Sequence, residues 1–134
     1  MAVNTTPIFG KATALAYVQV STANTGRDGT GTAPQLIAGV ADGTLVTKFR
    51  FKATVTTTAG MIRLFLSLDG GTTKRLWAEL DVAAITVGAN TKSDEEDYVP
   101  AEPLYLANTS AIVYASTHNA EAINVFADGF TYAA

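Results

Sequence analysis

Hydrophobic and polar residues alternate with a period of two in three consecutive runs between Leu45 and Asp81. Turn-forming residues interrupt the alternation at positions 58–60 and 69–73. Because successive side chains of a strand point to opposite faces of its sheet, the pattern predicts an antiparallel meander of three strands. The side chains expected to face the core are Leu45, Phe49, Phe51, Ala53 and Val55 in the first run, Ile62, Leu64, Leu66 and Leu68 in the second, and Leu76, Ala78, Leu80 and Val82 in the third.

Five shorter apolar runs, bounded by turn residues, predict further strands at 12–22, 35–40, 104–106, 110–116 and 121–127. We expect Asp128 and Gly129 to form a turn after the last of them. No segment of helical length carries apolar residues at a spacing of three to four. About eight short strands separated by turns indicate an all-β antiparallel sandwich, and a jelly-roll-like arrangement fits the long loops better than an immunoglobulin pattern does.

The first eleven residues read differently from the rest of the chain. Pro7 favours an extended backbone before it, and Ile8 and Phe9 are two adjacent large apolar residues. We therefore expect an extended N-terminal arm over residues 1–11, anchored by Ile8 and Phe9, and a single β-sandwich domain over residues 12–134. A frayed terminus is the alternative.

The amino-acid composition argues against several classes of site and partner. The chain has no Cys, so we expect neither disulfides nor thiolate metal sites. Its net charge of −3 hides a division, since residues 1–77 hold eight of the nine Lys and Arg and residues 78–134 hold nine of the twelve Asp and Glu. Such halves can pair within one domain or between subunits. The overall acidity argues against nucleic acid as the main partner, and no apolar run is long enough to span a membrane. The N-terminus carries no pattern of a secretory signal.

Two polar segments are candidate ligand-binding sites, but each has a simpler interpretation. The Gly-rich stretch 23–34 could cradle an ion, yet it lacks the sequence of a phosphate loop or a calcium loop, and an ordinary surface loop is the expectation. The acidic run 94–97 could bind Ca²⁺ weakly or meet a basic patch on a partner. Four adjacent carboxylates repel one another, however, so we expect a solvated loop.

Catalytic constellations are not evident. The one histidine, His118, falls in a predicted hairpin turn, where an exposed side chain is the expectation, and no Cys is available as a nucleophile or zinc ligand. Glu79 and Asp81 share one face of a strand, as surface carboxylates routinely do. We expect no enzymatic activity and no cofactor.

The outward face of the meander is the better candidate for a working surface. Phe65 and Trp77 come out nearly opposite each other across the turn at 69–73, and aromatic residues beside arginines are typical of subunit contacts. The alternative is that the domain's own loops cover this face. The predicted interaction residues are Ile8, Phe9, Lys48, Arg50, Lys52, Arg63, Phe65, Arg75 and Trp77.

Several low-complexity motifs together resemble small proteins encoded near the head genes of tailed bacteriophages. The motifs are Thr6-Pro7-Ile8-Phe9, Ser21-Thr22-Ala23-Asn24-Thr25, Asp28-Gly29-Thr30-Gly31-Thr32, Ala41-Asp42-Gly43, Arg63-Leu64-Phe65, Asp69-Gly70-Gly71 and Leu104-Tyr105-Leu106. The resemblance implies a virion structural protein, foremost a capsid decoration (cement) protein that binds the major capsid protein on the shell surface as a small homo-oligomer, with a trimer favoured. It supplies no catalytic residues.

Two rival functions are compatible with the same sequence. One is a receptor- or carbohydrate-binding module of a tail or spike, for which Trp77, Tyr98 and Tyr105 are the candidate aromatic residues. The other is a tail or head–tail connector component, which would assemble as a larger ring.

Overall fold

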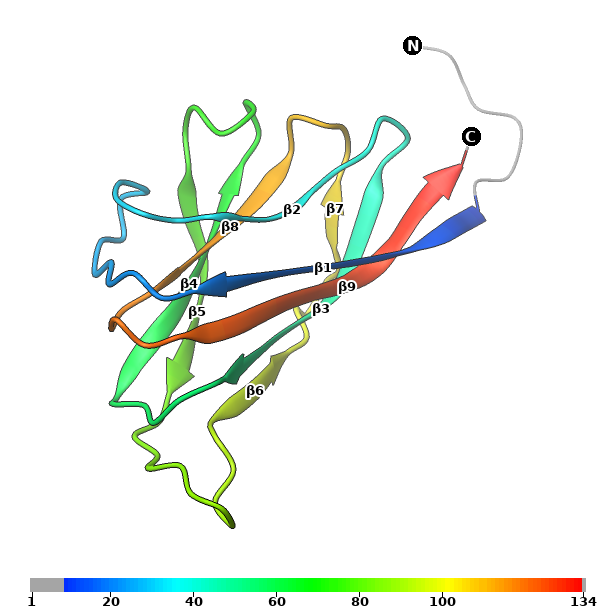
Figure 1. Ribbon diagram of the computed structural model, residues 1–134. Helices are drawn as coiled ribbons and strands as arrows, with labels where there is room; N and C mark the ends of the chain where they lie inside the picture. Colours follow the sequence, from blue (N-terminus) through cyan, green and yellow to red (C-terminus); the bar gives the residue numbers. More distant parts are fainter. Residues whose placement is uncertain (1–8, 134) are drawn as a thin grey trace.

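The structure is a computed structural model that describes residues 9–133, and it contains only strands, turns and loops over that range (Figure 1). The predicted all-β class is confirmed. The strands are β1 Phe9–Val20, β2 Gln35–Ala38, β3 Thr44–Ala53, β4 Gly60–Ser67, β5 Arg75–Val82, β6 Glu95–Tyr98, β7 Leu104–Leu106, β8 Ile112–Thr117 and β9 Ile123–Ala133.

The strands form two antiparallel sheets that pack face to face as a sandwich. Sheet A has the order β1-β9-β3-β6, with β7 also pairing with β3, and sheet B has the order β2-β8-β4-β5. Their inner faces enclose one apolar core, because alternate residues of each strand point inward. The fully buried core side chains include Phe49 and Phe51 from sheet A and Ile62 and Leu64 from sheet B.

The predicted meander is correct for only one of its two connections. β4 and β5 form the expected hairpin, but β3 lies in the other sheet, between β9 and β6. The connection 54–59 crosses from sheet A to sheet B, and Thr57 fixes the corner. Its hydroxyl donates to the Ala83 carbonyl at 2.7 Å, and its backbone pairs with Ile85. Periodicity identifies strands but not their neighbours, and tertiary packing decided the pairing here.

Two segments expected to be irregular are strands. Three of the four residues of the acidic run, Glu95 to Asp97, belong to β6 and pair with β3, so the prediction of a solvated loop is wrong. β9 continues through Asp128 and Gly129 without a turn. Gly129 is needed because a Cβ there would collide with the carbonyl oxygen of Leu45, at the point where β3 bulges at Thr47.

The N-terminal boundary also differs from the prediction. Phe9, Gly10 and Lys11 are part of β1, whose first pairs are Phe9 with Ala133 and Gly10 with Tyr132. The remainder of the predicted arm, including Ile8, lies outside the described residues, and the side chain of Phe9 is not described.

Candidate interaction surface

The outer face of sheet A is built as three ladder rows that cross the sheet. The register places Leu15 beside Asp128 and Lys48, and the next row is Tyr17, Phe126, Arg50 and Asp97. The third row is Gln19, Asn124, Lys52 and Glu95. Because the side-chain period of a strand is two, all of these side chains leave the sheet on the side away from the core.

The basic stripe predicted on β3 (Lys48, Arg50 and Lys52) lies on this face, and its partner is the acidic strand β6. Arg50 donates to Glu95 at 2.6 Å, and Lys48 lies 3.3 Å from the Asp97 carboxylate. The hydrogen bond from Lys92, together with the charges of Lys52 and Lys92, lowers the pKa of Glu95. Within the described residues, the two oppositely charged halves of the chain therefore meet inside one domain.

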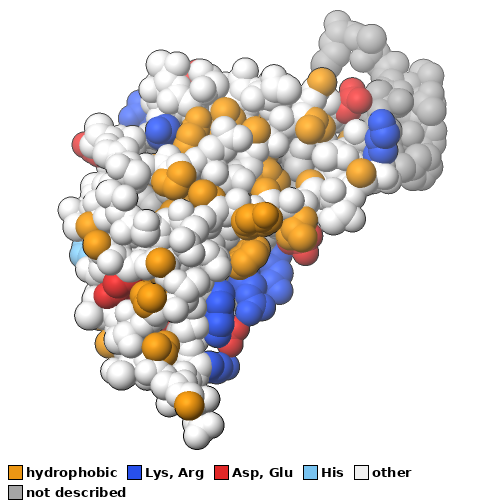
Figure 2. Space-filling view, viewed as in Figure 1, with side chains coloured by type: hydrophobic (Ala, Val, Ile, Leu, Met, Phe, Trp, Pro, Cys, Tyr) orange, Lys and Arg blue, Asp and Glu red, His pale blue; other side chains and the backbone are white. Residues whose placement is uncertain are grey.

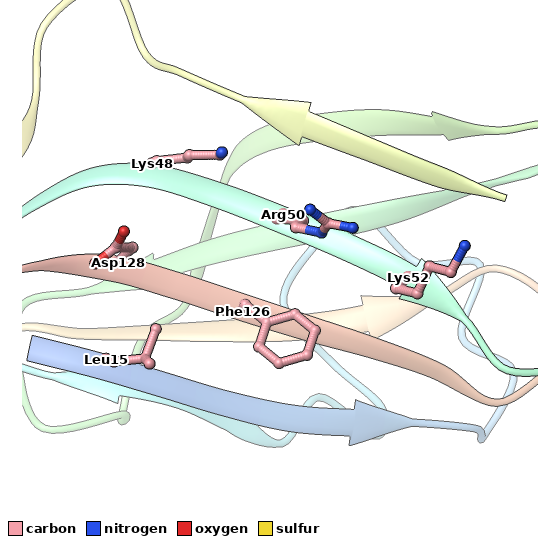
Figure 3. Close-up of a pocket in the computed structure, with 6 residues that line it drawn as sticks. All are labelled: Leu15, Lys48, Arg50, Lys52, Phe126 and Asp128. Carbon is pink, nitrogen blue, oxygen red and sulfur yellow. The ribbon is translucent and has the colours of Figure 1, made fainter.

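An apolar strip runs beside the basic stripe, along β1 and β9. Leu15 and Tyr17 are 65% and 74% exposed, among the most exposed large hydrophobic side chains of the described residues. The Tyr17 and Phe126 rings lie with centroids 6.2 Å apart. Leu15, Phe126 and Asp128 line one hollow with the three basic side chains of the stripe (Figure 3). In the space-filling view, hydrophobic side chains gather beside a row of Lys and Arg side chains (Figure 2).

A second aromatic group lies at the far end of the same sheet. Tyr132 makes edge-to-face contacts with Tyr105 at 6.0 Å and with Phe130 at 5.3 Å between ring centroids. Tyr105 is exposed, and with Tyr132, Leu45 and Asp42 it lines a shallow hollow. Gly43 allows this packing, because its φ is +98° and a Cβ there would meet the Tyr105 hydroxyl.

The outer face of sheet B is covered over β4, and the prediction that Arg63 and Phe65 are exposed is wrong. Phe65 is 0% exposed and Arg63 is 1% exposed. The loop 21–34 lies across this face: Arg27 pairs with Glu79 at 3.0 Å, and Arg63 donates to the Asn24 carbonyl at 3.3 Å. The alternative interpretation, that the domain's own loops cover the meander, is the correct one for these two residues.

Buried Arg63 is satisfied by three groups from different segments. Its Nε donates to Glu79 Oε2 at 3.0 Å, and its two terminal nitrogens lie 3.2 and 3.3 Å from His118 Nδ1. His118 is half-buried, which differs from the exposed side chain we expected. Burial acts to raise the pKa of Glu79, but the hydrogen bonds and charges of Arg27 and Arg63 outweigh it and lower that pKa.

Trp77 faces the core because of a bulge that the sequence pattern does not reveal. Pairing between β4 and β5 steps from Leu64–Ala78 to Phe65–Leu76, which leaves Trp77 as the extra residue. The indole consequently turns inward and packs on Phe49 at 5.3 Å and on Tyr98 at 5.8 Å. The structure therefore does not bring Trp77 and Phe65 together on one exposed face.

Arg75 is the remaining predicted residue, and it is exposed at the start of β5. With Leu68, Leu76 and Trp77 it borders a hollow at the β4–β5 turn. Asp69 shapes this turn, accepting hydrogen bonds from the Thr73 amide and the Ser67 hydroxyl, and these bonds lower its pKa.

Sequence reasoning named Tyr105 as a candidate aromatic residue but missed the other apolar members of the open face, which are Leu15, Tyr17, Phe126, Phe130 and Tyr132. One signal could have indicated some of them. In β1 the inward positions carry small or branched residues (Ala14, Ala16 and Val18), so that the larger Leu15 and Tyr17 must point outward. It also missed Asn24, whose amide donates to Thr30 and Thr32 and shapes the covering loop.

The described residues offer no ready metal centre. No group of three or more His, Asp or Glu among them is arranged to hold a metal ion. Glu96 stands near Asp81 and Asp94, and burial, followed by the charges of those two carboxylates, raises its pKa. Residues 9–133 also include no helix that is long and apolar enough to cross a membrane.

Comparison with known proteins does not assign the chain to a family. No protein-family model matches the chain, and no curated protein matches it significantly.

Proposed function

We propose that this protein is a structural component of a phage virion, a capsid decoration protein that binds the major capsid protein on the outer surface of the shell and stabilises it. It is made in the bacterial host cytoplasm and acts on the virion. The single observation that carries the binding role is the open outer face of sheet A, where exposed Leu15 and Tyr17 adjoin the Lys48–Arg50–Lys52 stripe. The assignment to a capsid is supported by the resemblance of the sequence motifs to phage head proteins.

The residue composition of this face suits contact with another protein. It combines exposed aromatic side chains with charged groups at its border, which is the usual composition of a protein interface. Many such contacts made together on a repeating shell give avidity without any strong single contact. We also infer a jelly-roll topology, because the pairs β1–β9, β2–β8, β3–β6 and β4–β5 are nested one inside another, as in a long hairpin wound into a sandwich.

Purified protein mixed with undecorated, expanded capsids of the phage that encodes it tests the proposal. We expect saturable, ordered binding that is lost in the double variant Lys48→Glu, Lys52→Glu, because this reverses the charge of the stripe. Arg75→Glu is the control, since Arg75 is also basic and is exposed but lies on sheet B. Absence of binding, together with normal capsid stability after deletion of the gene, would contradict the role.

A second function, carbohydrate binding on a tail or spike, is favoured by one feature. Exposed Tyr105 and half-buried Tyr132 lie beside Asp42 in the hollow at the far end of sheet A. Aromatic faces with a nearby carboxylate are suited to sugars. Of the aromatic candidates from the sequence, Trp77 and Tyr98 pack against the core and only Tyr105 is exposed. Binding of glycans that Tyr105→Ala abolishes, without binding to capsids, would favour this function.

The third alternative, a tail or connector component, differs in the size of its assembly. A ring of about six or twelve copies in solution would favour it over a decoration protein.

A further inference from the structure

The outer edge of β1 is a long strand edge along which no strand of the described residues 9–133 pairs. Among the described residues β9 is the only strand that pairs with β1, so the opposite edge of β1 presents free backbone N–H and C=O groups. β1 spans twelve residues, and Lys11 is its one charged residue. It contains no proline, and its one register shift, at Gly10/Ala12, lies near its start. Natural sheets usually blunt such edges with charges, prolines, bulges or shortness.

The other sheet edges carry these protections. β6 and β7 have four and three residues, and Pro100 and Pro103 lie between them. β2 has four residues, an irregular register and Pro34 just before it. β5 bears the exposed charges Arg75, Glu79 and Asp81. The unprotected edge is therefore specific to β1, and a general tolerance of open edges does not explain it.

We propose that β1 pairs antiparallel with β1 of a second copy of this chain across a two-fold axis. Antiparallel pairing of identical strands is self-complementary, which is the requirement for a symmetric dimer. The axis passes beside Ala16, so that Leu15 of each copy lies opposite Tyr17 of the other. A shift of the axis by one residue in either direction would pair Leu15 with itself and Tyr17 with Thr13, or Tyr17 with itself and Leu15 with Gln19. The axis at Ala16 places each of the two exposed apolar side chains beside an apolar partner.

Charge favours the β1 edge over the basic stripe as the place where a second copy sits. When two copies are joined through β1, the β9 and β1 strands of both copies lie between the two basic stripes. The distance between the stripes is then five strand spacings, or roughly 24 Å. Such a separation exceeds the screening length of about 8 Å at physiological salt, so the stripes do not repel each other appreciably. The pair presents one continuous outer face, apolar at the centre and basic on both sides. This arrangement is a dimer, whereas the resemblance to phage head proteins favours a trimer.

Sedimentation and light scattering of the full chain over a range of concentrations test the pair. We expect a dimer, and we expect Leu15→Lys combined with Tyr17→Lys to raise its dissociation constant at least about tenfold, because edge lysines oppose strand pairing. The control is Leu68→Lys, since Leu68 is similarly exposed at 71% but lies after β4. Circular dichroism checks that both variants keep the fold. A monomer at all concentrations, a trimer, or a dimer that survives the double variant would overturn the proposal.

Cysteine cross-linking tests the register independently, because the chain has no Cys of its own. Ala16→Cys is expected to form a disulfide-linked dimer on mild oxidation, since the two-fold axis brings that position next to itself. Thr13→Cys should not, because Thr13 faces Gln19 of the other copy. Cross-linking of Thr13→Cys in preference to Ala16→Cys would overturn the register. Neither experiment involves capsids, so failure of the capsid role leaves the dimer testable, and the reverse holds as well.

Discussion

The outer faces of the two sheets differ in how exposed their large apolar side chains are, and the sequence pattern does not predict this difference. Both carry large apolar side chains that alternate with core residues, Phe65 on sheet B and Tyr17 on sheet A. On sheet B, the loop 21–34 crosses the face and buried Arg63 anchors it through Glu79 and the Asn24 carbonyl. On sheet A, Tyr17 is 74% exposed. An outward apolar residue therefore becomes structural or available for binding according to which loop passes over it.

The largest expected effect separates the two faces by stability. Phe65→Ala should lower the free energy of unfolding by about 3–5 kcal/mol, because it removes a fully buried aromatic ring. Leu15→Ala, on the open face, should change it by no more than about 0.5 kcal/mol. Urea denaturation of both variants measures the difference. Equal effects would show that the outer face of sheet A is also covered in solution.

The anchor of the covering loop should be the next most sensitive position. Arg63→Ala is expected to cost about 3 kcal/mol, the lower part of the range for breaking a buried ion pair, because Glu79 keeps its second partner Arg27. Amide hydrogen exchange in the loop 21–34 should rise at the same time. Arg75→Ala is the control, and its exposed side chain should leave both stability and exchange nearly unchanged. An unchanged exchange rate in the loop would show that Arg63 does not hold it.

Trp77→Ala distinguishes a packing role from a binding role. Because the indole contacts Phe49 and Tyr98, we expect a loss of about 3 kcal/mol in stability. At a temperature where the variant is folded, its oligomeric state should match that of the unaltered chain. A variant of normal stability with a weakened oligomer would reverse this assignment.

A smaller effect is expected from pH. The folded-state pKa of Glu79 is lowered from its ordinary value of 4.5, so the unfolded chain binds more protons than the folded one between the two values. The contribution of Glu79 is therefore fully present above pH 4.5 and is lost as the pH falls through the folded value. Glu79→Gln should flatten the fall in urea midpoint below about pH 5. An identical pH profile in the variant would assign the acid sensitivity to other carboxylates.

The smallest effect concerns the ion pairs of the open face. Lys48, Arg50 and Glu95 are partly exposed, so salt screens their attraction, and 1 M NaCl should change thermal stability only slightly. Binding through this face should weaken much more strongly with the same salt. If salt destabilises the fold but leaves binding intact, the stripe acts mainly within the domain.

Local pattern was sufficient for some elements of the fold. The β4–β5 hairpin follows from two alternating runs around Asp69-Gly70-Gly71. All eight predicted strands exist, the one at 104–106 with the predicted ends and the others with shifted ends. The ninth strand, β6, was missed because its three adjacent acids are favourable in a strand only where a basic partner lies alongside. Trp77 was assigned to the wrong face because a single bulge residue shifts the alternation by one.

The candidate interaction surface could also be predicted in part, where local alternation was sufficient. The basic stripe of β3 was identified by its period of two, but its pairing with β6 needed a contact more than 40 residues away. The sequence of β1 indicates that Leu15 and Tyr17 point outward. Their exposure, however, depends on the absence of a covering loop within the described residues. Arg63 had the same local appearance as Arg50 and ended in the opposite environment.

By itself, the sequence determined that this is an all-β protein of alternating strands without disulfides, because period and turn chemistry act over a few residues. The tertiary structure decided which strands are neighbours, which outer face a loop closes, and which charges meet. These depend on contacts between distant segments, and a local alternation of polar and apolar residues is compatible with several such arrangements. The free edge of β1 depends on both: its composition is in the sequence, and only the fold shows that no strand of residues 9–133 pairs with it.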